Sequence, residues 1–195
     1  MPNADTVRTA AIAQGRRVKR INALTALACG VLPAVALALW RPGGPEAWLA
    51  GLLAGLVWAN GFEYVYHRFL LHLPGSFFGR PHLAHHASIG TPGEAADLNL
   101  AGSSARVVLL FAANGAPIVA ADLLLGLRVA PAMLLAFAAY LMAAEEIHWR
   151  IHLGGRLPPG LGSARTYHFA HHERPESRFN IFLPLFDWLL GHARG

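Results

Sequence analysis

The stretch AWLAGLLAGLVWANGFEYVYHRFLLH, residues 47–72, joins an apolar run directly to His67 and His72. Its first part has the apolar side chains that a membrane-spanning helix needs, and no proline separates that part from the two histidines. We therefore expect one helix that crosses a membrane and carries histidines beyond its end. Residues 130–152, APAMLLAFAAYLMAAEEIHWRIH, have the same layout and end in His148 and His152.

The composition of the whole chain points the same way. Of its 195 residues, 54% are hydrophobic and only 14% are charged, which is unusual for a soluble domain. No long apolar run shows the charged stripe of an amphipathic helix in a soluble bundle. We expect an all-α integral membrane protein with four transmembrane helices in two hairpins and a histidine-rich cytosolic cap. The expected spans are 21–40, 47–66, 106–126 and 130–149.

The basic residues predict how the chain is oriented. Of the 16 lysines and arginines, only Arg41 and Arg128 lie in the two short turns expected outside. Because positive charge stays on the cytoplasmic side, we expect both termini in the cytoplasm and the spans in a bacterial inner membrane. The net charge of +5 flanks the spans, so lipid headgroups and not nucleic acid are the expected partner. The expected parts are a cytosolic basic tail, 1–20, and a single membrane domain, 21–195, with its cap at 67–105 and 150–195.

Ten of the eleven histidines fall into four clusters near the cytosolic ends of the second and fourth spans. Residues three and four apart share a face of a helix, so each His-x-x-His-His triplet presents three imidazoles to one side. The adjacent pair in a triplet diverges by about 100°, enough to reach two different metal ions. His67 and His72 are five apart, about 140° around an ideal helix, so we expect them to straddle a helix end or to bridge both metals. The ten expected ligands are His67, His72, His82, His85, His86, His148, His152, His168, His171 and His172.

Two carboxylates are expected to support these histidines. Ligating histidines usually donate their second N–H to a carboxylate or a carbonyl. Glu63 lies four residues before His67, and Glu145 lies three before His148, so each shares a helix face with its histidine. His192 stands apart from the clusters, and we expect it to be structural or solvated.

The number of histidines indicates two metal ions. Four ligands satisfy a structural zinc site, and ten imidazoles are too many for one. Imidazole suits zinc, copper, iron and nickel alike, so the ligands alone leave the metal open. The single cysteine, Cys29, lies within a span and suggests no thiolate site. An all-histidine dinuclear site is the expected arrangement.

The four clusters resemble the motifs of the membrane fatty acid hydroxylase and sterol desaturase superfamily. The likeness is strongest to the fatty acid 2-hydroxylases, whose ten ligand positions all find a match by spacing. It covers about residues 48–191, and residues 179–191 are similar to the family's C-terminal segment. The matching motifs read His67-Arg-Phe-Leu-Leu-His72, His82-Leu-Ala-His85-His86, His148-Trp-Arg-Ile-His152 and His168-Phe-Ala-His171-His172.

The resemblance implies a membrane-bound hydroxylase that uses O2. Its metal centre would hold two iron ions, which zinc can replace in purified protein, and no catalytic residue beyond that centre is implied. The substrate would be a lipid, a fatty acyl or sterol-like chain, that reaches the centre from the bilayer. The 20 residues before the first span are too few for a cytochrome b5 domain, so we expect a separate electron donor of the ferredoxin or cytochrome b5 type.

Other functions stay open at this point. Carotenoid hydroxylases and lipid desaturases of the same chemistry have similar clusters, although carotenoid hydroxylases usually space the third pair by four residues, and three separate His148 from His152. A bis-histidine haem electron carrier would need histidines facing each other within two spans. A metal transporter would need polar side chains through the bilayer, where only Asn60, Asn114 and Asp122 occur in or near the spans.

Overall fold

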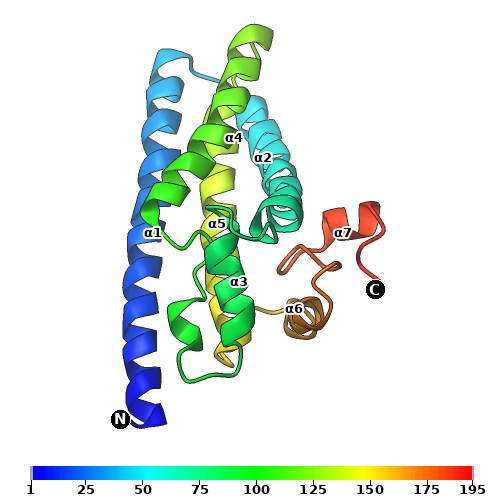
Figure 1. The fold of residues 1–195 in the computed structure, drawn as a ribbon. Helices are drawn as coiled ribbons and strands as arrows, with labels where there is room; N and C mark the ends of the chain where they lie inside the picture. Colours follow the sequence, from blue (N-terminus) through cyan, green and yellow to red (C-terminus); the bar gives the residue numbers. More distant parts are fainter. Residues whose placement is uncertain (1, 195) are drawn as a thin grey trace. The chain divides into compact units, whose positions relative to one another are not determined.

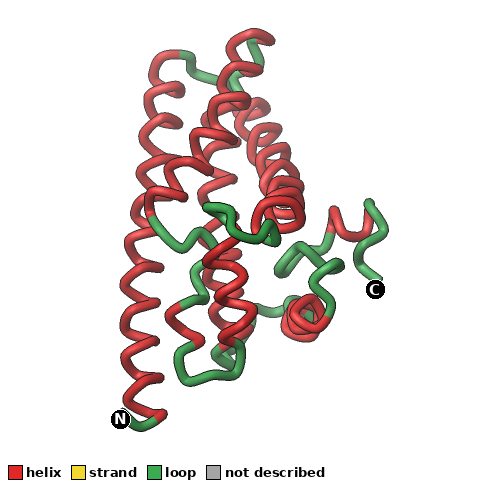
Figure 2. The backbone as a smooth tube through the Cα atoms, viewed as in Figure 1, coloured by secondary structure: helices red, strands yellow, loops and turns green. Residues whose placement is uncertain are grey.

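A computed structural model describes residues 2–194, and this part of the chain is helical with no strand (Figures 1 and 2). The expected all-α class is thereby confirmed. The long helices are α1 (Ala4–Trp40), α2 (Pro45–Val65), α4 (Ser104–Leu125) and α5 (Ala130–His152). The short ones are the π-helix η1 (Tyr66–Leu71), α3 (Gly79–Ser88), the 3-10 turn η2 (Glu94–Ala96), α6 (Ala164–Glu173) and α7 (Leu185–Leu189).

Three of the long helices, α1, α4 and α5, are long and apolar enough to cross a membrane. Within the described residues α2 does not reach the same hydropathy, because Glu46, Asn60 and Glu63 lie inside its 21 residues. The number of four spans therefore stays a prediction. The basic tail is not separate from the first span, because α1 begins at Ala4, where the Asn3 side chain accepts a hydrogen bond from the Thr6 amide at 2.8 Å.

The chain divides into two compact units, which we call the apolar unit (21–59 and 104–143) and the histidine unit (2–20, 60–103 and 144–194). The basic tail belongs to the second of these, and the expected division into a tail, 1–20, and a membrane domain stays a prediction. The expectation of a single membrane domain over 21–195 stays a prediction.

In the apolar unit, four helical segments run alongside one another (Figure 1). The turn between α4 and α5 is closed by Asp122, whose Oδ1 accepts hydrogen bonds from the amides of Val129 at 2.6 Å and Ala130 at 3.1 Å. Trp58 donates its indole N–H to the Asn114 side chain at 2.9 Å, which joins α2 to α4. These polar side chains satisfy one another and the helix ends, as buried groups in an apolar surrounding must.

Glycines allow α2 and α5 to approach closely in the same unit. A methyl group added to Gly51 would lie 2.5 Å from the Val129 carbonyl oxygen. One added to Gly55 would lie 2.7 Å from the Ala136 Cβ and 2.8 Å from the Met133 Cα. Gly51 and Gly55 are four residues apart, which is the small-xxx-small spacing that brings membrane helices together.

In the histidine unit, the basic start of α1 packs against the loop that follows α3. Gly15 adjoins the Ala95 carbonyl and the Trp149 ring so closely that a methyl group would clash with both. The Asn99 side chain donates to the Gly15 carbonyl at 3.2 Å, and Lys19 forms an ion pair with Glu146 at 2.7 Å. These contacts fix the part of α5 that carries His148 and His152.

We expect Gly55→Ala to destabilise the protein, because the new methyl group meets backbone and Ala136 with no flexible side chain to yield. Overpacking of this kind costs about 1–3 kcal/mol, more than the roughly 1 kcal/mol that alanine gains over glycine in a helix. The matched control is Gly115→Ala in α4, where the added methyl group meets only the end of Leu134 at 3.4 Å. Thermal unfolding in detergent should give a lower Tm for Gly55→Ala alone. An unchanged or raised Tm for that variant would show that the close approach is absent.

Candidate metal centre

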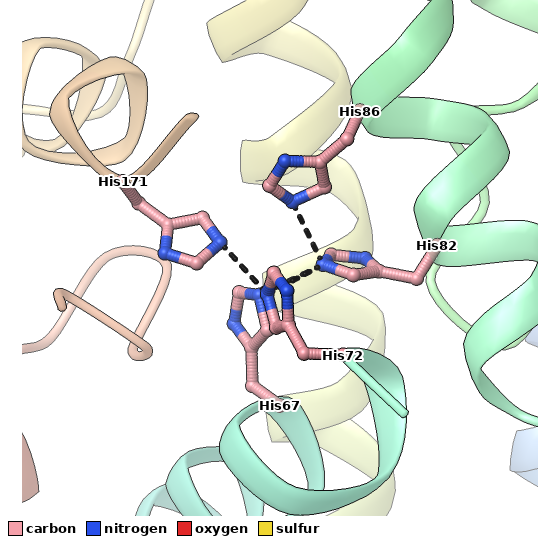
Figure 3. Close-up of side chains that lie close together, drawn as sticks. All are labelled: His67, His72, His82, His86 and His171. Atoms are coloured by element: carbon pink, nitrogen blue, oxygen red, sulfur yellow. Dashed lines mark hydrogen bonds between the residues drawn. The ribbon is translucent and has the colours of Figure 1, made fainter. Parts of the chain in front are cut away.

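The ten clustered histidines gather into two groups of five in the histidine unit. Within each group, one ring nitrogen of every histidine lies within 4.8 Å of those of the other four. His192 belongs to neither group. Group A is His67, His72, His82, His86 and His171 (Figure 3), and group B is His85, His148, His152, His168 and His172.

Each triplet divides between the two groups in the way that its spacing predicts. On α3, His82 and His86 are four apart and enter group A, while His85 enters group B. On α6, His168 and His172 enter group B, while His171 crosses to group A. Neighbouring residues on a helix point about 100° apart, so an adjacent pair serves two centres.

The pair His67 and His72 joins a single group because the helix changes its pitch. The π-helix η1 begins at Tyr66, directly after α2, and His72 caps its end. Its i→i+5 hydrogen bonds place residues five apart above one another, which an α-helix does not do. The two rings accordingly stack with their centroids 5.2 Å apart at 14°. The pair therefore lies at a helix end, as one of the two expectations has it, and does not bridge the groups.

The nitrogens that converge are mostly Nε2 atoms. In group A, Nε2 of His82 lies 3.0 Å from that of His67 and 3.2 Å from that of His72 (Figure 3). In group B, Nε2 of His172 lies 2.9 Å from that of His168 and 3.2 Å from that of His85. Two nitrogens that bind one ion at about 2.1 Å and at right angles to each other are also about 3.0 Å apart. The donor sets thus have the spacing of metal ligands.

The opposite ring nitrogen, Nδ1, contacts an oxygen of the surrounding chain in four of the histidines, which are His67, His148, His152 and His171. Nδ1 of His67 contacts the Phe179 carbonyl, and Nδ1 of His171 contacts the Ser177 carbonyl at 2.7 Å. A carbonyl oxygen only accepts, so these nitrogens carry the hydrogen, and the lone pair is left on Nε2. In group B, Nδ1 of His148 lies 2.9 Å from the Leu98 carbonyl, and its Nε2 has no hydrogen-bond partner within the described residues. A buried nitrogen lone pair without a donor fits a metal ligand.

Burial favours the neutral form of the most buried of these imidazoles. It lowers the pKa of His67, His82, His85 and His168 well below the usual value, and the neighbouring histidines lower it further. For the same reasons the pKa of His86 falls to about 3. Neutral imidazole is the form that binds metal ions, so little proton competition is expected near neutral pH.

Glu63 and Glu145, the expected supports of the histidines, bind residues next to the carbonyls that His67 and His148 contact. Glu63 accepts from the Asn180 side chain at 2.7 Å and the Ile181 amide at 3.4 Å. These residues follow Phe179, whose carbonyl contacts His67. The carbonyl beside Nδ1 of His67 thus comes from a loop of the other half of the chain, and the supporting role of Glu63 stays a prediction.

Glu145 has the corresponding arrangement. It accepts from the Leu100 amide at 3.0 Å, two residues after the carbonyl that contacts His148. Each helix thus carries a glutamate that binds the loop in which its own histidine finds an acceptor. Behind the first loop, buried Asp187 accepts from the amides of Phe179 at 3.0 Å and Asn180 at 2.8 Å.

Glu94 is a supporting carboxylate that the sequence did not reveal. Its Oε1 lies 2.7 Å from Nδ1 of His152, and its Oε2 accepts from the Gly90 amide at 3.0 Å. Glu94 lies 58 residues before His152, in a loop with no periodic pattern, so spacing could not link the two. His192 is structural, because its Nδ1 lies 3.0 Å from the Tyr64 hydroxyl.

We expect Glu94→Ala to weaken metal binding in group B by about 10- to 100-fold, the usual effect of removing the acceptor behind a ligating histidine. Glu94→Gln should lose less, because its amide oxygen still accepts from His152. Competition with a chelator of known affinity measures the change, and Glu46→Ala, an exposed glutamate of the apolar unit, is the control. Equal affinities for Glu94→Ala and the control would contradict this role.

Comparisons with known proteins agree with this geometry. The chain matches a solved structure described as full-length Scs7p with only the hydroxylase domain visible, with a TM-score of 0.64 and 23% sequence identity. The match covers 85% of this chain and 62% of that one, and at this identity it shows the shared fold. A search of curated proteins finds no match. The sequence model of the fatty acid hydroxylase family matches residues 52–192, which include all ten histidines of the two groups, so the chain belongs to the fatty acid hydroxylase family.

Proposed function

We propose that the protein is a membrane-bound, O2-dependent hydroxylase of a fatty acyl or sterol-like lipid, with two iron ions held by the ten histidines. The observation that carries the proposal is the convergence of five histidines at each of two adjoining places in a member of the fatty acid hydroxylase family. The groups adjoin because Nδ1 of His172 lies 3.3 Å from Nδ1 of His86. In this proposal α2 is a fourth span and both termini lie in the cytoplasm.

The residues of the chain have defined tasks in this reaction. Hydroxylation of a C–H bond by O2 consumes two electrons and two protons and releases water. Bound iron would supply the O2 reduction and the hydrogen abstraction that this requires. The ten histidines bind and orient the ions, and the carbonyls of Phe179 and Leu98 keep two of those rings in one tautomer. The electrons would come from a separate donor protein.

A haem carrier is disfavoured by the same distances. In bis-histidine ligation the two imidazoles lie on opposite sides of the porphyrin plane, about 4 Å apart across the iron. Here the Nε2 atoms of His168 and His172 are only 2.9 Å apart, and three further histidines complete the group. A transporter is disfavoured because few polar side chains of the apolar unit are buried, and two of them, Asn114 and Asp122, form hydrogen bonds with its backbone.

The first prediction concerns the metal content. Anaerobic reconstitution should give two iron ions per chain, and His85→Ala and His86→Ala should each deplete a different one, because the neighbouring residues serve different groups. Mössbauer spectra of the two variants should therefore lose different components. His192→Ala is the control and should retain both ions. A loss in His192→Ala as large as in the other variants would contradict the assignment.

The second prediction concerns the product. The iron-loaded protein in lipid nanodiscs, supplied with 18O2 and with ferredoxin or cytochrome b5 and the matching reductase, should produce hydroxy-lipid that carries 18O. The His85→Ala and His86→Ala variants should form none above background. If the protein holds two iron ions, accepts electrons and still leaves every lipid unchanged, the proposed activity is wrong.

A further inference from the structure

The histidine unit exposes large apolar side chains in two stretches only, among the residues that the structure describes. One stretch is 65–77, which continues from the end of α2, and the other is 183–190, which includes α7. Trp188 and Leu189 are the most open of them, at 66% and 67% exposure. The full set is Val65, Phe69, Leu70, Leu73, Phe77, Leu183, Trp188, Leu189 and Leu190.

The two stretches are joined at the end of α2. The Asn60 side chain donates to the Leu183 carbonyl at 2.7 Å. A methyl group added to Gly61 would lie 2.8 Å from the Phe186 ring, so this ring rests directly on the helix. Gly61 and Val65 are four residues apart and share a face of the helix. The two stretches are therefore in contact at the end of α2, and we call their exposed side chains together the α7 surface.

Among the described residues, the rest of the unit exposes no other large apolar side chain. The start of α1 exposes Arg8, Arg16 and Arg17, and the end of α6 exposes Glu173 and Arg174. The large exposed apolar side chains are therefore concentrated in the two stretches, as in proteins that dock on another surface.

The side chains of the α7 surface indicate a lipid surface as its occupant. α2, from which it continues, already exposes Leu49 and Leu53 in its apolar part. Tryptophan is enriched where a protein meets the membrane interface, and Trp188 is exposed here beside leucines. Arginine favours the headgroup level, and Arg80 and Arg194 are exposed just beyond the ends of the two stretches.

We propose that the α7 surface lies in the interfacial layer of the lipid bilayer, so that the histidine unit is seated on the membrane by α7 and by residues 65–77. This does not depend on the proposed hydroxylation. It gives the exposed Trp188 and Leu189 an apolar environment, which water would not provide. This position would also fix how far from the bilayer the loop 179–183 lies, and the Phe179 carbonyl of that loop contacts His67.

Spin labels in liposomes test the proposal. In a Cys29→Ser background, labels are placed singly at Leu189→Cys and Phe77→Cys; both positions are exposed, and the Phe77 ring also contacts Phe78. Arg17→Cys is the aqueous control, and Leu53→Cys is the bilayer control. The measured quantity is the ratio of collision rates with O2, which concentrates in lipid, and with a water-soluble nickel chelate. Iron content of each labelled protein confirms that the histidine unit is folded.

At Leu189 and Phe77 we expect a ratio severalfold above that at Arg17 and below that at Leu53. The same ratio as at Arg17 in both neutral and anionic liposomes would overturn the proposal. Protection from both collision partners, together with a short label-to-label distance between chains, would also overturn it, because the surface would then be buried between two copies. Neutral and anionic liposomes are compared, and a ratio that rises only with anionic lipid supports the interfacial position through the arginines.

Discussion

Lone pairs of neutral imidazoles repel one another, and this repulsion is the constraint on which the histidine unit depends. Five ring nitrogens within 4.8 Å of one another would be stabilised by a cation between them. The rest of the unit holds them against that repulsion: carbonyls of distant loops fix His67 and His148, and Glu94 fixes His152. If the two groups hold ions, binding of those ions and folding of this unit would be coupled.

The supporting loops are arranged reciprocally between the two halves of the chain. The loop after α6 supplies the carbonyl for His67 at the end of α2, and the loop after α3 supplies the carbonyl for His148 on α5. Glu63 and Glu145 each bind the loop that crosses to their own helix. Each half thus completes the surroundings of the other half's histidines, so neither set of ligands is oriented by its own half alone.

Local periodicity predicted much of this, and tertiary contacts account for the remainder. The helical spacing of the triplets was enough to separate His85 from His86, and hydropathy identified the long apolar helices. The π-helix that brings His67 and His72 together has no signal in the sequence apart from the five-residue spacing itself. The partners of His67 and His152 lie 112 and 58 residues away, where no local pattern reaches. Glu63 was placed on the correct helix face, but a backbone carbonyl from a distant loop occupies the position beside the ring.

The helices α3 and α6 each contribute histidines to both groups. For a protein that holds two ions, this sharing has a thermodynamic consequence. His85 on α3 belongs to group B, whereas His82 and His86 on the same helix belong to group A. An ion in group A would fix α3 and thereby orient His85 in group B, and α6 would act in the same way through His171. Linkage is reciprocal, so each ion must raise the affinity for the other by the same factor. Two separate sets of five ligands would lack this coupling, because no helix would be shared between them.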